Sequence, residues 1–160
     1  MPPEPARENR PLTNIVGLAT VFLIFPLGVA FIAAWVIGML ALHLALCLAW
    51  LPRGRRVLFV TSDSPKWKPY LDEHVVPRLP ASAVVLNWSE RARWSPFNLG
   101  VWLYRMWSGP REYNPVAIVL RPLRSPKVYR FFGAFEEQRR GKPEPLREVE
   151  GALLAELGAR

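Results

Sequence analysis

Acidic, amide, hydroxyl and basic side chains follow three short apolar runs of this 160-residue sequence. The three groups are Thr61-Ser62-Asp63-Ser64, Asn87-Trp88-Ser89-Glu90-Arg91 and Arg121-Pro122-Leu123-Arg124-Ser125. Carboxyl groups such as those of Asp63 and Glu90 act as general acids or bases. Arginine side chains bind phosphate or carboxylate groups. The three groups therefore indicate a site for an anionic ligand.

The predicted ligand-binding residues share a position directly after an apolar run, and they are Ser62, Ser64, Asn87, Arg91, Arg121 and Arg124. In an enzymatic alternative, Asp63 and Glu90 are the acids and Arg91 and Arg121 hold the anion. Polar residues in such loops more often form caps and turns. The sequence also lacks a Walker loop, a G-x-G-x-x-G motif and a G-x-S-x-G motif. We therefore favour binding over catalysis.

The sequence predicts neither a metal nor a cofactor. Its single cysteine, Cys47, excludes a disulfide framework and a cysteine-based zinc site. The two histidines, His43 and His74, are too few for a histidine-rich metal site.

The elements that would position these groups recur along the chain. The apolar runs Val57–Thr61, Ala83–Asn87 and Val116–Leu120 are typical of parallel strands buried on both faces. Each is followed by a Ser-Pro pair, and serine followed by proline favours the start of a helix. This order predicts a small α/β domain of the βαβαβα type, with three layers and a parallel sheet. The three loops would then share one edge of the sheet.

Two further helices are predicted. The first, Pro96–Trp107, lies in a stretch rich in tryptophan and arginine, and the second runs from Leu146 to Leu157. Burial between the sheet and its neighbours would account for the first helix. Contact with a membrane surface or with a protein partner is the alternative. The residues predicted to make that contact are Trp94, Trp102, Arg105 and Trp107. Binding to nucleic acid is disfavoured, because no nucleic-acid-binding motif is present.

A run of 42 residues, Pro11–Pro52, contains no Asp, Glu, Lys or Arg. A helix of about 20 residues spans a bilayer, so this run is predicted to be embedded in a membrane. One long span kinked at Pro26 and a hairpin of two short spans are both open, with the single span favoured because Pro26 is off-centre. The predicted organisation is thus a head at 1–10, a membrane segment at 11–52 and an α/β domain at 53–160.

Basic residues near the membrane segment orient the chain. Five of them, Arg53, Arg55, Arg56, Lys66 and Lys68, follow the segment, whereas Arg7 and Arg10 precede it. Because lysine and arginine prefer the cytoplasmic side, the domain is predicted to face the cytoplasm. Residues 53–160 include 19 basic and 11 acidic residues, so their formal net charge is +8.

These features predict a basic, integral membrane protein with a cytoplasmic α/β module. Its expected partners are anionic lipid headgroups, an anionic small ligand, a protein or a second copy of the chain. The alternative function is a small membrane-tethered enzyme that acts on a nucleotide, a phosphate or a sugar phosphate.

Overall fold

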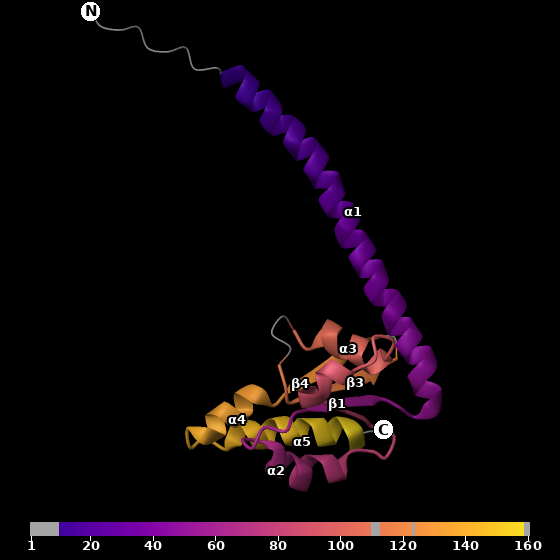
Figure 1. Cartoon of the computed structure of the whole chain (residues 1–160), viewed down its shortest axis with the longest axis vertical. Coiled ribbons are helices and arrows are strands. Elements are labelled where there is room, and N and C mark those ends of the chain that lie inside the picture. The colour runs from indigo at the N-terminus through magenta and orange to yellow at the C-terminus, as the bar shows by residue number, and fades with distance from the viewer. Residues whose placement is uncertain (1–9, 110–112, 123, 159–160) are drawn as a thin grey trace, which may run out of the picture. The chain divides into compact units, whose positions relative to one another are not determined.

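A computed structural model describes residues 10–109, 113–122 and 124–158, and all but Arg10 of the predicted head lies outside these ranges. The chain forms two compact units, Met1–His43 and Leu44–Arg160, which are described separately (Figure 1).

The described part of the first unit and the start of the second form a single helix. Helix α1 runs without interruption over Arg10–Trp50 and contains Pro26, so the chain does not form the hairpin alternative. The segment Ile24–Arg53 is long and apolar enough to span a membrane, judged by length and composition. Large apolar side chains such as Phe25, Phe31 and Trp35 are exposed along it, as expected of a helix whose partner is lipid.

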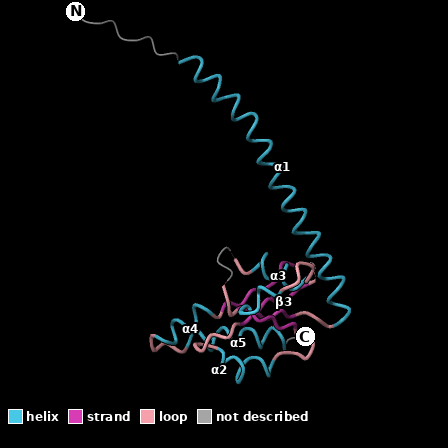
Figure 2. Tube along the Cα trace, in the orientation of Figure 1, coloured by secondary structure: helices cyan, strands magenta, loops and turns pink. Residues whose placement is uncertain are grey.

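The second unit contains a mixed four-stranded sheet, seen as the magenta segments in Figure 2. Its strands are β1 (Val57–Thr61), β2 (Val84–Asn87), β3 (Val116–Arg121) and β4 (Arg124–Arg130), in the order β2-β1-β3-β4. Strands β1 and β2 are parallel, as the sequence predicts, with Phe59 beside Val85. Strand β3 is antiparallel to both β1 and β4. The all-parallel sheet is therefore not confirmed.

The third Ser-Pro pair explains this difference. Ser125 and Pro126 were expected to begin a helix, but they lie in β4, which pairs with β3 as a hairpin. Proline cannot donate a ladder hydrogen bond, and β4 is an edge strand, where that loss is tolerated. The chain thus turns back directly after β3, so no crossover helix leads to a further parallel strand.

The other Ser-Pro pairs lie in turns rather than at helix caps. After Ser64, a turn leads into a short helical segment made of α2 (Lys68–Tyr70), a π-helical turn (Leu71–Val75) and a 3₁₀ turn (Val76–Arg78). A 3₁₀ segment, Trp88–Arg93, follows β2. Helix α3 (Leu99–Trp107) begins three residues later than predicted, because Asn98 caps it by accepting a hydrogen bond from the Gly100 amide.

Two helices complete the domain, α4 (Phe132–Arg139) and α5 (Glu144–Gly158). The predicted C-terminal helix is confirmed by α5. Gly141, between the two helices, has a φ of +85°, which glycine adopts without strain.

Helices cover both faces of the sheet (Figure 1). Phe59, Ala117 and Tyr129 belong to the core that also contains residues of α4 and α5, such as Phe135 and Leu153. On the opposite face, Gly100 of α3 lies beside Leu58 and Trp50. Alternation of side chains along each strand produces these two cores.

The end of α1 belongs to the core on the α3 face of the sheet. Leu46 and Trp50 are 1% and 5% exposed, whereas Leu44 and Leu48 of the same turns are exposed. The last turns of the apolar helix are therefore part of the folded domain.

Candidate functional site

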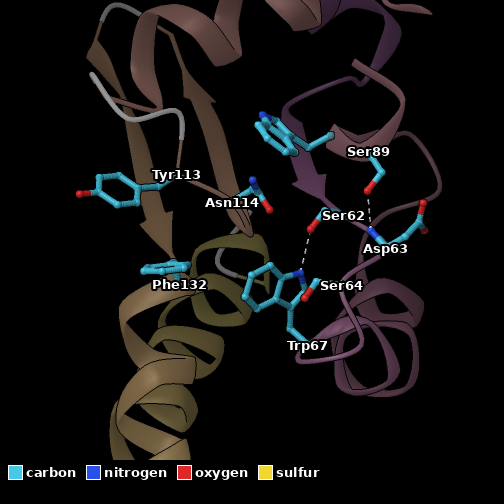
Figure 3. A pocket seen from close by; sticks show the side chains of 9 residues that line it. Ser62, Asp63, Ser64, Trp67, Ser89, Tyr113, Asn114 and Phe132 are labelled. Carbon is cyan, nitrogen blue, oxygen red and sulfur yellow. Dashed lines mark hydrogen bonds between the residues drawn. The ribbon is translucent and has the colours of Figure 1, made fainter. Parts of the chain in front are cut away.

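An open pocket of about 700 Å³ lies where β1 and β2 end and β3 begins (Figure 3). Its polar lining includes Ser62, Asp63 and Ser64 after β1 and Ser89 after β2, together with Asn114, which precedes β3. The predicted edge thus carries a pocket, and the volume is within the range of small-molecule sites. The antiparallel β3 contributes its amino end to this edge.

Hydrogen bonds tie the two loops that follow the parallel strands. The Ser89 hydroxyl accepts a bond from the Asp63 amide at 2.9 Å, and Asn87 Nδ2 donates to Asp63 Oδ2, also at 2.9 Å. Asn87 Oδ1 accepts from the Ser89 amide. This network holds Ser62, Asp63 and Ser64 on one side of the pocket.

Asp63 is engaged at the rim of the pocket. Its carboxylate accepts the Asn87 bond and lies 3.2 Å from Lys68 Nζ. The Asn87 bond, followed by Lys68, lowers the pKa of Asp63 below its usual value. In Figure 3 the side chain of Asp63 points away from the cavity. Asp63 is therefore ionised and paired, which suits a loop anchor better than a proton donor.

Aromatic rings form much of the wall. Phe132 lies between Tyr113 and Trp67, with ring centroids at 5.8 Å and 6.1 Å respectively. The Trp67 indole N–H donates to Ser62 Oγ at 3.0 Å, which fixes the ring (Figure 3). Trp88, from the loop after β2, adds a fourth ring. Such a wall favours a ligand with a flat or apolar face.

Two polar atoms of the lining residues have no hydrogen-bond partner. Trp88 Nε1 and Asn114 Oδ1 are buried without one among the described residues. Leaving a buried donor or acceptor unpaired costs about 1–3 kcal/mol. One is a donor and the other an acceptor, and neither atom is accessible to solvent, so a ligand would meet them only after the side chains around them move.

The predicted arginines do not converge on this pocket. Arg121 and Arg124 lie at the end of β3 and the start of β4, at the opposite end of the sheet, because β3 is antiparallel. Arg121 donates to the Ser125 carbonyl at 3.2 Å and 3.0 Å. The expectation that all three loops share one edge is therefore wrong for the third loop.

Arg91 and Glu90 lie beside the pocket rather than in it. The guanidinium of Arg91 stacks on Trp88, 3.7 Å from the ring centroid, and it is exposed. Glu90 is exposed and is not among the described lining residues. Asp63 and Glu90 thus do not face a common reacting atom inside the cavity.

The residues predicted to contact a membrane or a partner divide into two groups. Trp102 and Arg105 are exposed on α3. Trp94 is half-buried with its ring edge-on to Tyr104 at 5.7 Å, and Trp107 is also half-buried. The burial expected for this helix holds for Val101, Leu103 and Tyr104.

Several lining residues were missed from the sequence, namely Trp67, Tyr113, Asn114 and Phe132. Trp67 fits an apolar helix face equally well, and Phe132 follows β4, where the sequence predicts a helix. Asn114 could be identified only from the direction of β3. Because β3 is antiparallel to β1, the residues just before β3 lie at the edge where β1 and β2 end. Val128 and Tyr129 are residue types that favour strands, but the order Lys127, Val128, Tyr129 and Arg130 does not alternate, so periodicity does not indicate the hairpin.

Within the described ranges, no three His, Cys, Asp or Glu side chains cluster as metal ligands would. No family model matches the chain, and comparison with curated proteins and with solved structures finds no match.

Proposed function

We propose that this chain is a membrane-anchored module whose cytoplasmic domain binds a flat, uncharged ring in the pocket at the ends of β1 and β2. A nucleobase or nucleoside has the required chemistry, namely a ring face and an edge with both donors and acceptors. Helix α1 is long and apolar enough to serve as the anchor, and the basic residues after it favour the cytoplasmic side for the domain.

One observation carries the ligand class. The pocket combines four aromatic rings with an unpaired donor on Trp88 and an unpaired acceptor on Asn114. Stacking a base on an aromatic side chain contributes about 1–3 kcal/mol. A ring whose edge both accepts and donates a hydrogen bond would add the missing polar contacts once these two buried atoms open toward the pocket.

The charge of the lining argues against a phosphate as the main recognition element. The described residues that line the pocket include Asp63 but no lysine or arginine. Arg121 and Arg124, which supported an anionic ligand, lie at the other end of the sheet. We therefore propose that affinity comes from the ring and its edge.

Catalysis has weaker support than binding. A nucleotide- or sugar-phosphate-processing enzyme would need Asp63, Glu90 and the arginines around one reacting atom. Asp63 is held by Asn87 and Lys68, and Glu90 is exposed outside the lining. The enzymatic alternative would be revived by turnover that depends on Asp63.

Ligand binding is tested with the full chain in lipid nanodiscs. Uridine and adenosine are titrated beside their monophosphates by saturation-transfer NMR. We expect at least one nucleoside to bind about as tightly as its monophosphate, because the described residues that line the pocket include no lysine or arginine. Asn114→Ala should weaken binding, whereas Arg121→Ala, the matched control at the opposite end of the sheet, should not.

Preference for the monophosphates, lost in Arg121→Ala, would instead support the anionic-ligand alternative. No binding of any nucleoside by folded protein would reject the proposed ligand class. Topology is tested separately by fusing to the C-terminus a reporter that is active only in the cytoplasm. We expect this fusion to be active.

A further inference from the structure

The exposed side of α3 and the turn before it carries two large apolar rings beside a basic residue. Phe97 is 90% exposed and Trp102 is 52% exposed. Arg105 is also exposed, one turn beyond Trp102, so the two share a side of α3. The Trp102 indole N–H donates to the carbonyl of Pro96, the residue before Phe97. We call Phe97, Trp102 and Arg105 the α3 surface.

The charged side chains of the segment that contains the α3 surface have one sign. Residues 91–109 include Arg91, Arg93 and Arg105 and no acidic residue. All three arginines are exposed. A surface of arginine and tryptophan is complementary to anionic lipid headgroups, where tryptophan rings also prefer to lie.

The α3 surface belongs to the part of the domain into which the anchor leads. Trp50, at the end of α1, lies against Gly100 in the first turn of α3. The segment that is long and apolar enough to span a membrane, Ile24–Arg53, includes Trp50. Leu48, two residues before Trp50, is still exposed. The apolar helix therefore enters the domain at its contact with α3.

We propose that the α3 surface docks on the anionic leaflet of the membrane that holds α1. Phe97 and Trp102 insert among the headgroups, and Arg105, with Arg91 and Arg93, binds lipid phosphates. This inference rests on the anchoring part of the proposed function but not on the ligand of the pocket. Compared with the contact residues predicted from the sequence, the α3 surface leaves out the half-buried Trp94 and Trp107 and adds Phe97.

A fluorescent label beside the α3 surface tests the docking. Cys47 is the only cysteine, so Cys47→Ala provides a background for single labelling sites. One label is placed at Ala92→Cys, which is exposed and leaves the α3 surface intact. The control label is placed at Glu148→Cys, exposed on α5, which packs with the core of the other sheet face. Both full-length proteins are reconstituted in nanodiscs that contain anionic or only zwitterionic lipid.

The readout is quenching by acrylamide, a neutral quencher in the water phase. In anionic nanodiscs we expect protection at position 92 and not at position 148. The protection should be lost in zwitterionic discs and at about 1 M salt, where the screening length is about 3 Å. We expect the protection at position 92 to be reduced in each of two double variants, Phe97→Ala/Trp102→Ala and Arg93→Gln/Arg105→Gln.

Two outcomes separate docking from anchoring. If the full chain fails to remain in the nanodisc through gel filtration, the anchor assignment fails. If it remains but both labels are quenched equally in anionic discs, the docking proposal is overturned and the α3 surface is left for a protein partner. A chain that remains and protects only position 92 supports both.

Discussion

The ring of Trp50 lies so close to Gly100 that a β carbon added to Gly100 would be 3.4 Å from it. This contact joins the last turn of α1 to the first turn of α3. Sequence hydropathy would assign Trp50 to the membrane segment, yet its side chain is 5% exposed in the core of the domain. The contact has direct consequences for where the domain can be cut.

A fragment that begins at Arg53 should be less stable than one that begins at Leu44. The shorter fragment lacks Leu46 and Trp50, which are buried in the second unit. Burial of one large apolar side chain contributes about 1.5–3 kcal/mol, so the loss should reach several kcal/mol. Thermal unfolding of the two fragments, followed by circular dichroism, measures the difference. Equal melting temperatures would show that the end of α1 is dispensable for the fold.

Gly100→Ala should destabilise the domain by about 1 kcal/mol. The new β carbon would lie 3.1 Å from Asn98 Oδ1, which caps α3, and 3.4 Å from the Trp50 ring. Gly151→Ala in α5 is the matched control, since nothing lies within 4 Å of its added carbon. That control should stabilise its helix by about 0.5–1 kcal/mol. Urea unfolding of the Leu44–Arg160 fragment gives both values, and a stabilised Gly100→Ala would contradict the packing described here.

The domain should lose stability at alkaline pH through Tyr70. Its hydroxyl donates to Glu150 Oε2 at 2.5 Å, and Arg78 lies 2.8 Å from Glu150 Oε1. Desolvation and the bond to Glu150 raise the pKa of Tyr70 to about 12 from 10.0. Because the folded-state pKa is raised, this contribution is complete below pH 10.0 and is lost as pH rises through about 12.

Tyr70→Phe isolates that effect. It should lower the free energy of unfolding by about 1.5–3 kcal/mol at neutral pH, since it removes a hydrogen bond to a charged group. The difference between wild type and variant should shrink above pH 10. Urea titrations at a series of pH values give this difference, and a gap that stays constant through pH 12 would exclude Tyr70 as its source.

Asn87→Ala should weaken the pocket more than the fold. Asn87 joins the loops after β1 and β2, through Asp63 on one side and the Ser89 amide on the other. Losing the side chain should cost about 1–3 kcal/mol of stability and loosen the residues that face the ligand. Nucleoside titration by NMR measures the second effect, with Arg124→Ala at the far end of the sheet as control. Unchanged affinity in Asn87→Ala would mean that the network does not position the pocket.

The sequence predicted local features better than strand direction. The apolar runs, the long helix and α5 follow from hydrophobic continuity and helical periodicity, which are local properties. The direction of β3 depends on whether its successor is a helix or a strand. Ser125-Pro126 predicts a helix start, yet both residues lie in β4, whose side chains do not alternate regularly between buried and exposed. Because β3 is antiparallel to β1 and not parallel as predicted, its amino end with Asn114 lies at the pocket and its carboxyl end with Arg121 lies at the opposite end of the sheet.

The pocket was therefore half predictable. Ser62, Asp63 and Ser64 and the loop after β2 follow from the rule that ligands bind at the carboxyl ends of parallel strands. The aromatic wall depends on tertiary packing, since Trp67, Tyr113 and Phe132 come from three separate segments. No local pattern distinguishes such rings from core residues.

The order β2-β1-β3-β4 leaves two strand edges that another chain could pair with. One edge, β2, is only four residues long. The other, β4, carries Arg124, Lys127 and Arg130 together with Pro126. Short length, basic charge and proline are devices by which proteins prevent edge-to-edge aggregation. When many copies are crowded together, the sheet should therefore resist extending from one molecule into the next.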